Sequence, residues 1–359
     1  MIKRILYTLL IMFPVVASAQ INTDRVMAIG RNALYFEDYV LSIQYFNQVI
    51  NAKPYLSDPY FYRGLAKINL DDFQGAESDC SEAIERNPFV VSAYQVRGLA
   101  RIQQNNFAGA IEDYTKALEF DPENIGVWHN MALCRIRQED YKGAKNDLDK
   151  LIAISPRYTK AYLMRGEVDL KQKDTLAAEK DFGKAIEIDR YDADTWASRA
   201  ILRLQQQRYK DAEADFDHAI RLSTRNSGVY INRALARYHQ NNLRGAMSDY
   251  DIALDIDPNN FIGHYNRGLL RAQVGDDNRA IQDFNFVIEM EPDNMMAIFN
   301  RGLLLDQTGD YKGAIKDYST VINEYPNFLL GYQYRAQARR KIGDVKGADA
   351  DEFKVLKAQ

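Results

Sequence analysis

The feature that most limits how this chain can fold is a repeat of 34 residues. The window Met295–Phe328 holds two amphipathic helical patterns of about a dozen residues each, joined by a short Gly-Asp turn, and Pro326 stops the second pattern. The same pattern returns nine more times along the sequence without a gap. Neither helix can bury its apolar face alone, so the sequence predicts an array in which each repeat packs against its neighbours.

Small residues recur at two places when the repeat is numbered from 1 at its first residue. Position 8, in the first helix, is Gly in six of ten repeats, although Gly in a helix interior costs about 1 kcal/mol relative to Ala. Position 20, in the second helix, is Ala in nine repeats and Ser42 in the first. One small residue on each helix predicts a close crossing of the two. The residues given this structural role include Gly64, Gly98, Gly166, Gly268, Gly302, Ala110, Ala246 and Ala314.

Aromatic residues dominate positions 4 and 24, and Pro closes seven repeats. With the small residues, this pattern resembles the tetratricopeptide repeat family from Thr23 to the end of the chain. The resemblance implies an all-α fold, an α-solenoid that winds as a right-handed superhelix of ten helix-turn-helix repeats. It also implies a recognition scaffold, not a catalyst, whose first helices line a concave groove. The array spans residues 23–359, and its repeats start at residues 23, 57, 91, 125, 159, 193, 227, 261, 295 and 329.

Residues 1–19 stand apart from the array. Lys3 and Arg4 precede an apolar run, and Ala17-Ser18-Ala19 provides a small-x-small cleavage site. This layout is typical of a secretory signal peptide. The alternative is an uncleaved anchor, but the apolar run of about 12 residues is shorter than the roughly 20 that span a bilayer. The sequence therefore predicts an exported protein of a bacterial cell envelope, either periplasmic or secreted.

The composition indicates no catalytic site and no cofactor. The formal net charge is −4, which argues against a nucleic-acid partner. None of the four His residues has metal-ligand spacing, and no nucleophile elbow or phosphate loop is present. His264 is expected to be packed and hydrogen-bonded. Cys80 and Cys134 fall on core-facing positions two repeats apart, so they are expected to be buried thiols and not a disulfide.

A charge pattern repeats with the same period. Position 7 is Arg in eight repeats, position 23 is Asp in nine, and position 11 is mostly Arg or Lys. Like charges one turn apart repel mildly, so the basic stripe requires acids nearby. We expect a ladder of Arg–Asp pairs between first and second helices, with each exposed pair contributing about 0–1 kcal/mol. The alternatives are unpaired solvated charges or a nucleic-acid stripe, which the matching acids would neutralise.

The family resemblance places the partner-binding groove on positions 2, 5, 6, 9, 12 and 13 of the first helices. The groove would then be an apolar floor with amides along it, although positions 5, 9 and 12 could instead pack first helices together. The groove residues so assigned are Phe61, Tyr62, Leu65, Leu99, His129, Asn130, Leu133, Leu163, Ile231, Asn232, Leu235, Tyr265, Asn266, Leu269, Phe299, Asn300 and Leu303.

The function predicted from the sequence is an exported, non-enzymatic scaffold. It would bind a segment of another protein in its groove, or dock a cell-envelope complex along its length. Two alternatives remain open at this point: a structural spacer that uses its ends, and a carbohydrate or cell-wall binder that uses groove aromatics, since the chain has 23 Tyr.

Overall fold

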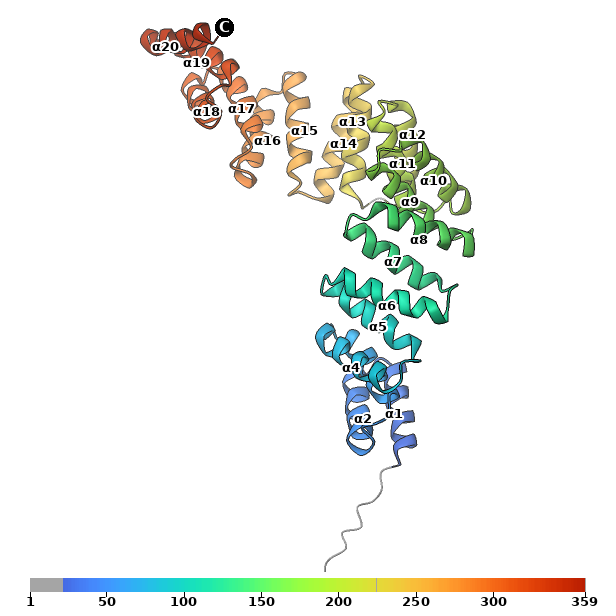
Figure 1. The fold of residues 1–359 in the computed structure, drawn as a ribbon. Helices are drawn as coiled ribbons and strands as arrows, with labels where there is room; N and C mark the ends of the chain where they lie inside the picture. Colours follow the sequence, from blue (N-terminus) through green and yellow to red (C-terminus); the bar gives the residue numbers. More distant parts are fainter. Residues whose placement is uncertain (1–21, 224, 359) are drawn as a thin grey trace, which may run out of the picture. The chain divides into compact units, whose positions relative to one another are not determined.

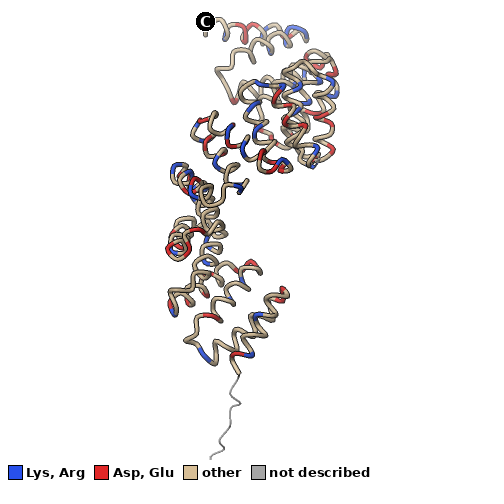
Figure 2. Tube along the Cα trace, turned by 90° about the vertical axis from the view of Figure 1, so that its right-hand side faces the viewer, with Lys and Arg blue, Asp and Glu red and all other residues tan. Residues whose placement is uncertain are grey.

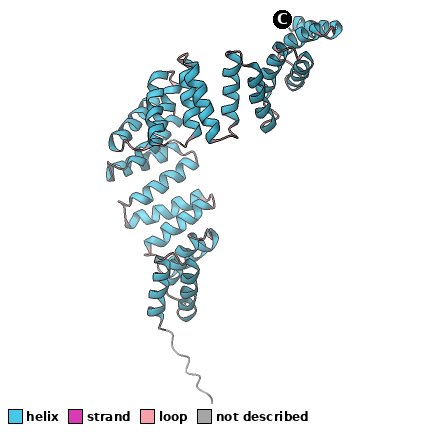
Figure 3. Ribbon diagram, turned by 180° about the vertical axis from the view of Figure 1, so that it is seen from behind, coloured by secondary structure: helices cyan, strands magenta, loops and turns pink. Residues whose placement is uncertain are grey.

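The computed structural model describes residues 22–223 and 225–358, so the predicted signal peptide lies outside the described residues. Within that part of the chain every regular element is an α-helix and none is a strand (Figure 3). The helices are α1 (Thr23–Tyr35), α2 (Tyr39–Ala52), α3 (Asp58–Ile68), α4 (Phe73–Arg86), α5 (Val91–Gln103), α6 (Phe107–Phe120), α7 (Ile125–Arg137), α8 (Tyr141–Ile154), α9 (Thr159–Lys171), α10 (Thr175–Ile188), α11 (Ala193–Gln205), α12 (Tyr209–Leu222), α13 (Ser227–His239), α14 (Leu243–Ile256), α15 (Phe261–Gln273), α16 (Asp277–Met290), α17 (Met295–Gln307), α18 (Tyr311–Glu324), α19 (Leu329–Lys341) and α20 (Val345–Lys357).

The chain divides after Gln172 into two compact units, with α1–α9 in the first and α10–α20 in the second. Within each unit, helix pairs follow one another in chain order (Figure 1). A second helix packs against the first helix of its own repeat and against the first helix of the next, as α4 does with α3 and α5. First helices of successive repeats also touch, as α15 does with α17. This arrangement is the predicted α-solenoid of helix-turn-helix repeats.

Each turn between the two helices of a repeat needs a left-handed backbone at position 15. In the last three repeats this residue is Gly, with φ between 78° and 91°. The earlier turns place non-Gly residues there, with φ between 59° and 63°, a conformation that costs about 1–2 kcal/mol for a residue with a Cβ. The non-Gly residues are Glu37, Asp71, Asn105, Glu139, Lys173, Gln207 and Asn241.

The residue after this turn starts the second helix. In most repeats it is Asp or Asn, and its side chain accepts a hydrogen bond from the backbone N–H three residues later. Asp72 accepts from Gly75 at 2.9 Å and Asp310 accepts from Gly313 at 3.0 Å. Such a cap satisfies one of the backbone donors that a helix leaves open at its start. A left-handed residue followed by a cap thus fixes where each second helix begins.

The small residues lie where the two helices of a repeat cross, as predicted. A Cβ added to Gly98 would come within 2.8 Å of the Tyr114 ring, and one added to Gly302 within 2.9 Å of Tyr318. Gly268 has slightly more room, at 3.2 Å from Phe284. The facing alanines of the second helices, such as Ala110 and Ala314, are fully buried. The position 24 ring therefore occupies the space that position 8 leaves open.

Both cysteines are free and fully buried, as predicted. Burial raises the pKa of Cys80 to about 12 and that of Cys134 to about 11, because a thiolate would be formed away from water. His264 is also packed as expected. Its ring stacks on Phe286 with centroids 4.1 Å apart, and its Nε2 lies 3.1 Å from the Pro258 carbonyl oxygen. None of the described helices is both long and apolar enough to cross a bilayer.

Candidate functional site

The predicted Arg–Asp ladder is present. In seven repeats, the guanidinium of position 7 on the first helix lies against the carboxylate of position 23 on the second, with shortest N–O distances of 2.5 to 2.8 Å. Blue and red segments accordingly alternate along the trace (Figure 2). The pairs are Arg63–Asp79, Arg97–Asp113, Arg199–Asp215, Arg233–Asp249, Arg267–Asp283, Arg301–Asp317 and Arg335–Asp351.

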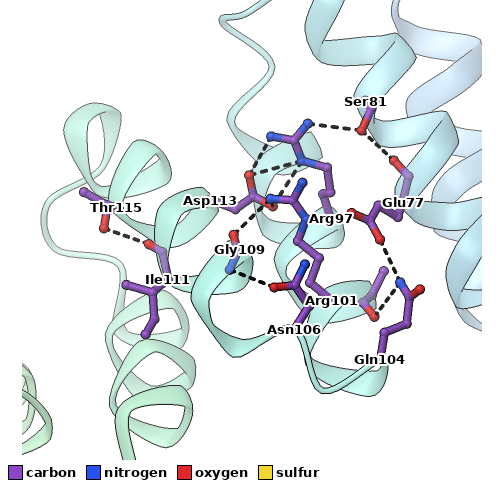
Figure 4. Close-up of polar contacts among 11 residues, drawn as sticks. Glu77, Ser81, Arg97, Arg101, Gln104, Asn106, Gly109, Ile111, Asp113 and Thr115 are labelled. Carbon is purple, nitrogen blue, oxygen red and sulfur yellow. Dashed lines mark hydrogen bonds and ion pairs between the residues drawn. The ribbon is translucent and has the colours of Figure 1, made fainter. Parts of the chain in front are cut away.

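Six of these seven arginines also reach back to position 25 of the preceding repeat, whereas Arg199 meets Gly183 there. Figure 4 shows Arg97 between Asp113 of its own repeat and Ser81 of α4, to which Arg97 Nη1 donates at 3.1 Å. Other repeats place Asn or Asp at this position 25, as with Asn47, which accepts from Arg63 at 2.6 Å. The sequence reasoning missed this partner, although Ser, Asn or Asp recurs there with the 34-residue period. The arginine therefore joins two repeats.

Position 11 adds a second cation to the same carboxylate. Arg101 lies 3.0 Å from Asp113 and also 2.8 Å from Glu77 on the preceding second helix (Figure 4). In one place the signs are exchanged: Lys145 on the second helix of the fourth repeat lies 2.5 Å from Asp169 at position 11 of the fifth. This pair still joins opposite charges, but the cation now lies on the second helix and the acid on the first. The junction between the fourth and fifth repeats therefore differs from the other junctions.

The ladder acids are buried, which corrects the expectation of exposed pairs. Asp249 is 1% exposed and Asp113 2%. Burial raises the pKa of Asp113 even though Arg97 and Arg101 favour its charged form. In six repeats a position 4 aromatic ring also covers the position 7 guanidinium, at 5.0 to 5.6 Å from the ring centroid. A buried carboxylate left without its partner is far more costly than an exposed one.

The fourth repeat has an incomplete set of cations. Met131 stands where the ladder arginine is expected, and Asp147 is approached by Arg135 at 2.7 Å. Arg135 also pairs with Asp140 at 3.0 Å. Burial of Asp147, which is 5% exposed, therefore outweighs the single cation and raises its pKa to about 6.

The groove predicted on the first helices keeps apolar side chains in contact with solvent. At position 9, Leu99 is 39% exposed and Leu269 40%. Leu65, Leu133, Leu235 and Leu303 are partly exposed. This row of half-covered leucines is available to a partner.

Position 5 divides into two groups. Phe61, His129, Leu163 and Tyr265 are half-buried, but Ile231 is 6% exposed and Phe299 8%. The last two therefore belong to the core and offer little surface to a partner. Ile231 extends into the space beside Gly263, and Phe299 is covered by Phe328 at a centroid distance of 5.1 Å.

Position 6 supplies the amides. Asn130, Asn232, Asn266 and Asn300 are half-buried, and Asn300 donates to the Tyr265 hydroxyl at 3.2 Å. The side chains of Asn232 and Asn266 make no hydrogen bond to any described residue. An amide offers both a donor and an acceptor, which matches the backbone of an extended peptide.

The groove aromatics have intramolecular neighbours. Tyr62 stacks on Phe46 with centroids 5.7 Å apart, and Tyr265 meets Phe284 edge-on at 5.8 Å. Their ring faces are thus partly used within the fold. Among the described residues, no group of three or more His, Cys, Asp and Glu side chains is placed to hold a metal ion.

The fold and the groove together define an α-solenoid scaffold of helix pairs. Sequence models described as tetratricopeptide repeat, or TPR repeat, match residues 98–134, 125–158, 159–192, 198–261 and 265–327. These matches cover more than half of the chain. The chain belongs to the tetratricopeptide repeat family.

Solved structures show the same fold at low sequence identity. A tetratricopeptide repeat protein from Parabacteroides merdae is 21% identical, with a TM-score of 0.53 over 69% of this chain and 98% of that one. The C-terminal part of a repeat-containing protein from Cytophaga hutchinsonii is 17% identical, with a TM-score of 0.55 over 66% and 97%. PilF of Pseudomonas aeruginosa is 18% identical, with a TM-score of 0.54 over 59% and 97%. No curated protein sequence matches this chain significantly.

Removing a ladder arginine should destabilise the fold strongly. In the variant Arg233→Met, the buried Asp249 keeps Arg237 but loses the guanidinium that lies 2.6 Å away. We expect the free energy of unfolding to fall by about 3 kcal/mol, measured by urea titration followed by circular dichroism. The control is Arg340→Met, because Arg340 pairs with the exposed Glu352 and Asp349. Equal losses in the two variants would contradict a buried ladder.

The free energy of unfolding should depend on pH through Asp147 of the fourth repeat. The pKa of Asp147 is raised in the folded protein, so the folded state binds protons more tightly than the unfolded chain. Ionisation of Asp147 therefore lowers the free energy of unfolding as the pH rises from about 4 to about 6. Above about pH 6 this destabilisation is complete and stays constant. Asp147→Asn should raise the free energy of unfolding at pH 7.5 by on the order of 2 kcal/mol and give little change at pH 4.5.

The control for this pH experiment is Asp249→Asn. That variant removes a carboxylate with two guanidinium partners, so it should lower stability at pH 7.5. Urea titrations at both pH values give the comparison. A stabilisation by Asp147→Asn that persists unchanged at pH 4.5 would contradict the titration of this group.

Proposed function

We propose that this protein is an exported, non-enzymatic scaffold that binds a segment of another protein along the concave face of its first helices. The observation that carries the proposal is the row of half-exposed leucines at position 9 beside the amides of Asn232 and Asn266, which bond to no described residue. Apolar side chains of a partner would contact the leucines, and its backbone would exchange hydrogen bonds with the amides.

The composition of the groove favours a protein segment over a carbohydrate. Sugar recognition by stacking needs open aromatic faces, but Tyr62 and Tyr265 lie against Phe46 and Phe284. The rest of the groove surface consists of aliphatic side chains and side-chain amides. The tetratricopeptide repeat framework supports the same conclusion, because its packing residues are separate from the first-helix positions that face a partner.

Replacing groove leucines should remove the partner while the fold persists. The variant Leu269→Arg/Leu303→Arg changes two partly exposed residues of the first helices. The matched control Ser248→Arg/Gln282→Arg adds the same charge at exposed positions of second helices. Crosslinking in the native host, followed by purification, should recover a protein with the wild type and the control but lose it with the groove variant.

A second groove variant, Leu65→Arg/Leu99→Arg, tests the first unit in the same way. Circular dichroism confirms that each variant is folded. A crosslinked partner retained unchanged by both groove variants would refute recognition through this face.

Export can be tested separately. The layout of residues 1–19 supports cleavage after Ala19 by a signal peptidase. N-terminal sequencing of the protein recovered from the envelope or medium should begin at Gln20. A mature protein that begins at Met1 and stays in the cytoplasmic fraction would refute export.

A further inference from the structure

A hollow in the second unit lies where the predicted groove meets the loop between repeats. Its volume is about 310 Å³. Its lining is mostly apolar and includes Met295, Phe299, Val321 and Phe328, with Asp293 and Asn294 as the polar residues. Met296 and Tyr325 stand at the opening and are 59% and 55% exposed. A cavity of this size accepts one large apolar side chain.

Tyr325 and Phe328, which line this hollow, differ from the residues at the same positions in the four preceding repeats. Position 31 is Asp, Glu, Ser, Asn or Lys in the earlier repeats, but Tyr325 occupies it in the ninth. Position 34 is Asn or Asp in the four preceding repeats, but Phe328 occupies it here and packs edge-on against Phe299. The hollow is therefore a local addition to the framework and not a consequence of repeat packing.

An apolar row extends the hollow across three first helices. Position 2 of α15, α17 and α19 is Ile262, Met296 and Leu330, which are 50%, 59% and 50% exposed. Earlier repeats carry polar residues or Gly at this position, including Asp58, Ser92, Gly126, Lys160, Asp194 and Gly228. Adjacent helices lie about 8–10 Å apart, so the row has about the spacing of every third residue in a polyproline II chain, whose three residues per turn place those side chains on one face.

The loops beside this row carry acids and no Lys or Arg of their own, although Lys354 and Lys357 of α20 line a hollow with residues of the last loop. Segments 255–262, 289–297 and 323–331 contain no Lys or Arg, and their acids form no ion pair with any described residue. Loops of earlier repeats, in contrast, include cations such as Arg86, Arg157 and Arg190. The acids are Asp255, Asp257, Glu289, Glu291, Asp293 and Glu324.

We propose that the last three repeats bind a basic amphipathic segment of another protein. An apolar side chain of the segment enters the hollow, two more lie on Ile262 and Leu330, and flanking Lys or Arg side chains face the acidic loops. This assignment rests on the proposed groove function and adds the location and the chemistry of the partner. Methionine is unbranched and adaptable, so Met295 and Met296 allow different apolar anchors to enter.

Synthetic peptides test this proposal with the full chain. The probe is a fluorescein-labelled peptide KKLKSLKSLKK, compared with the acidic twin EELESLESLEE and with KKSKSSKSSKK, which lacks apolar anchors. Fluorescence anisotropy should give a Kd at least tenfold lower for the probe than for either comparison peptide. Raising NaCl from 50 to 500 mM should weaken binding of the probe at least threefold, because salt screens exposed charges.

Two variants locate the site. Met296→Ser/Leu330→Ser removes exposed apolar surface and should weaken probe binding at least tenfold. Asp293→Lys/Glu324→Lys reverses the charge and should strengthen binding of the acidic twin while weakening the probe. The matched control Val40→Ser/Leu176→Ser replaces two exposed apolar residues of second helices, outside the groove, and should bind the probe as the wild type does.

Other outcomes would overturn the proposal in distinguishable ways. Loss of probe binding in the first-unit groove variant Leu65→Arg/Leu99→Arg alone would keep groove recognition but remove it from the last three repeats. Probe binding that is unchanged in that variant and in both variants of the last three repeats would refute groove recognition as well. Sedimentation that shows a dimer of the full chain, lost in Met296→Ser/Leu330→Ser, would identify a second copy as the occupant. Probe binding equal to that of KKSKSSKSSKK would show charge attraction without an apolar anchor.

Discussion

The buried carboxylate at position 23 is the group on which the rest of the structure depends. It lies between the two helices of its repeat, so it is removed from water, and it is tolerable there only because cations from the first helix meet it. The arginine that meets Asp113 also donates to Ser81 of the repeat before. One guanidinium thus sets the crossing of a helix pair and the junction to its neighbour.

Close packing and charge pairing support each other at this point. Gly98 lets the Tyr114 ring approach to a distance that a Cβ would block, and the same crossing places Arg97 against Asp113. Tyr94 then covers the same guanidinium at 5.6 Å. The ladder tolerates Ala at position 8, as at Ala200, Ala234 and Ala336, but a residue larger than Ala would overpack the crossing. The same few positions must therefore satisfy both the packing of the helices and the pairing of the charges. This explains why the 34-residue period is so regular.

The period, the helix pairs, the small crossing residues and the Arg–Asp partners could be predicted because each depends on spacing alone. Burial of the acids could not be predicted, because the spacing indicates which residues pair but not how far the pair lies from solvent. The left-handed turns at Glu139 and Gln207 were hidden because their residue types are ordinary for helices. Ile231 and Phe299 were placed in the groove by register, but Gly263 leaves a space for one and Phe328 covers the other. Both causes lie in a neighbouring element and not in the position itself.

Different positions of the repeat pack the helices and contact solvent, and this explains where specificity for a partner can arise. Positions 4, 7, 8, 11, 20, 23 and 24 are committed to the junctions, so a change there disturbs packing or leaves a buried charge unpaired. Positions 2, 31 and 34 touch neither the ladder nor the crossing. In the ninth repeat these three positions are Met296, Tyr325 and Phe328, and their side chains form a hollow on an otherwise conventional framework. A repeat protein can thus acquire a distinct binding surface without altering the contacts that hold its helices together.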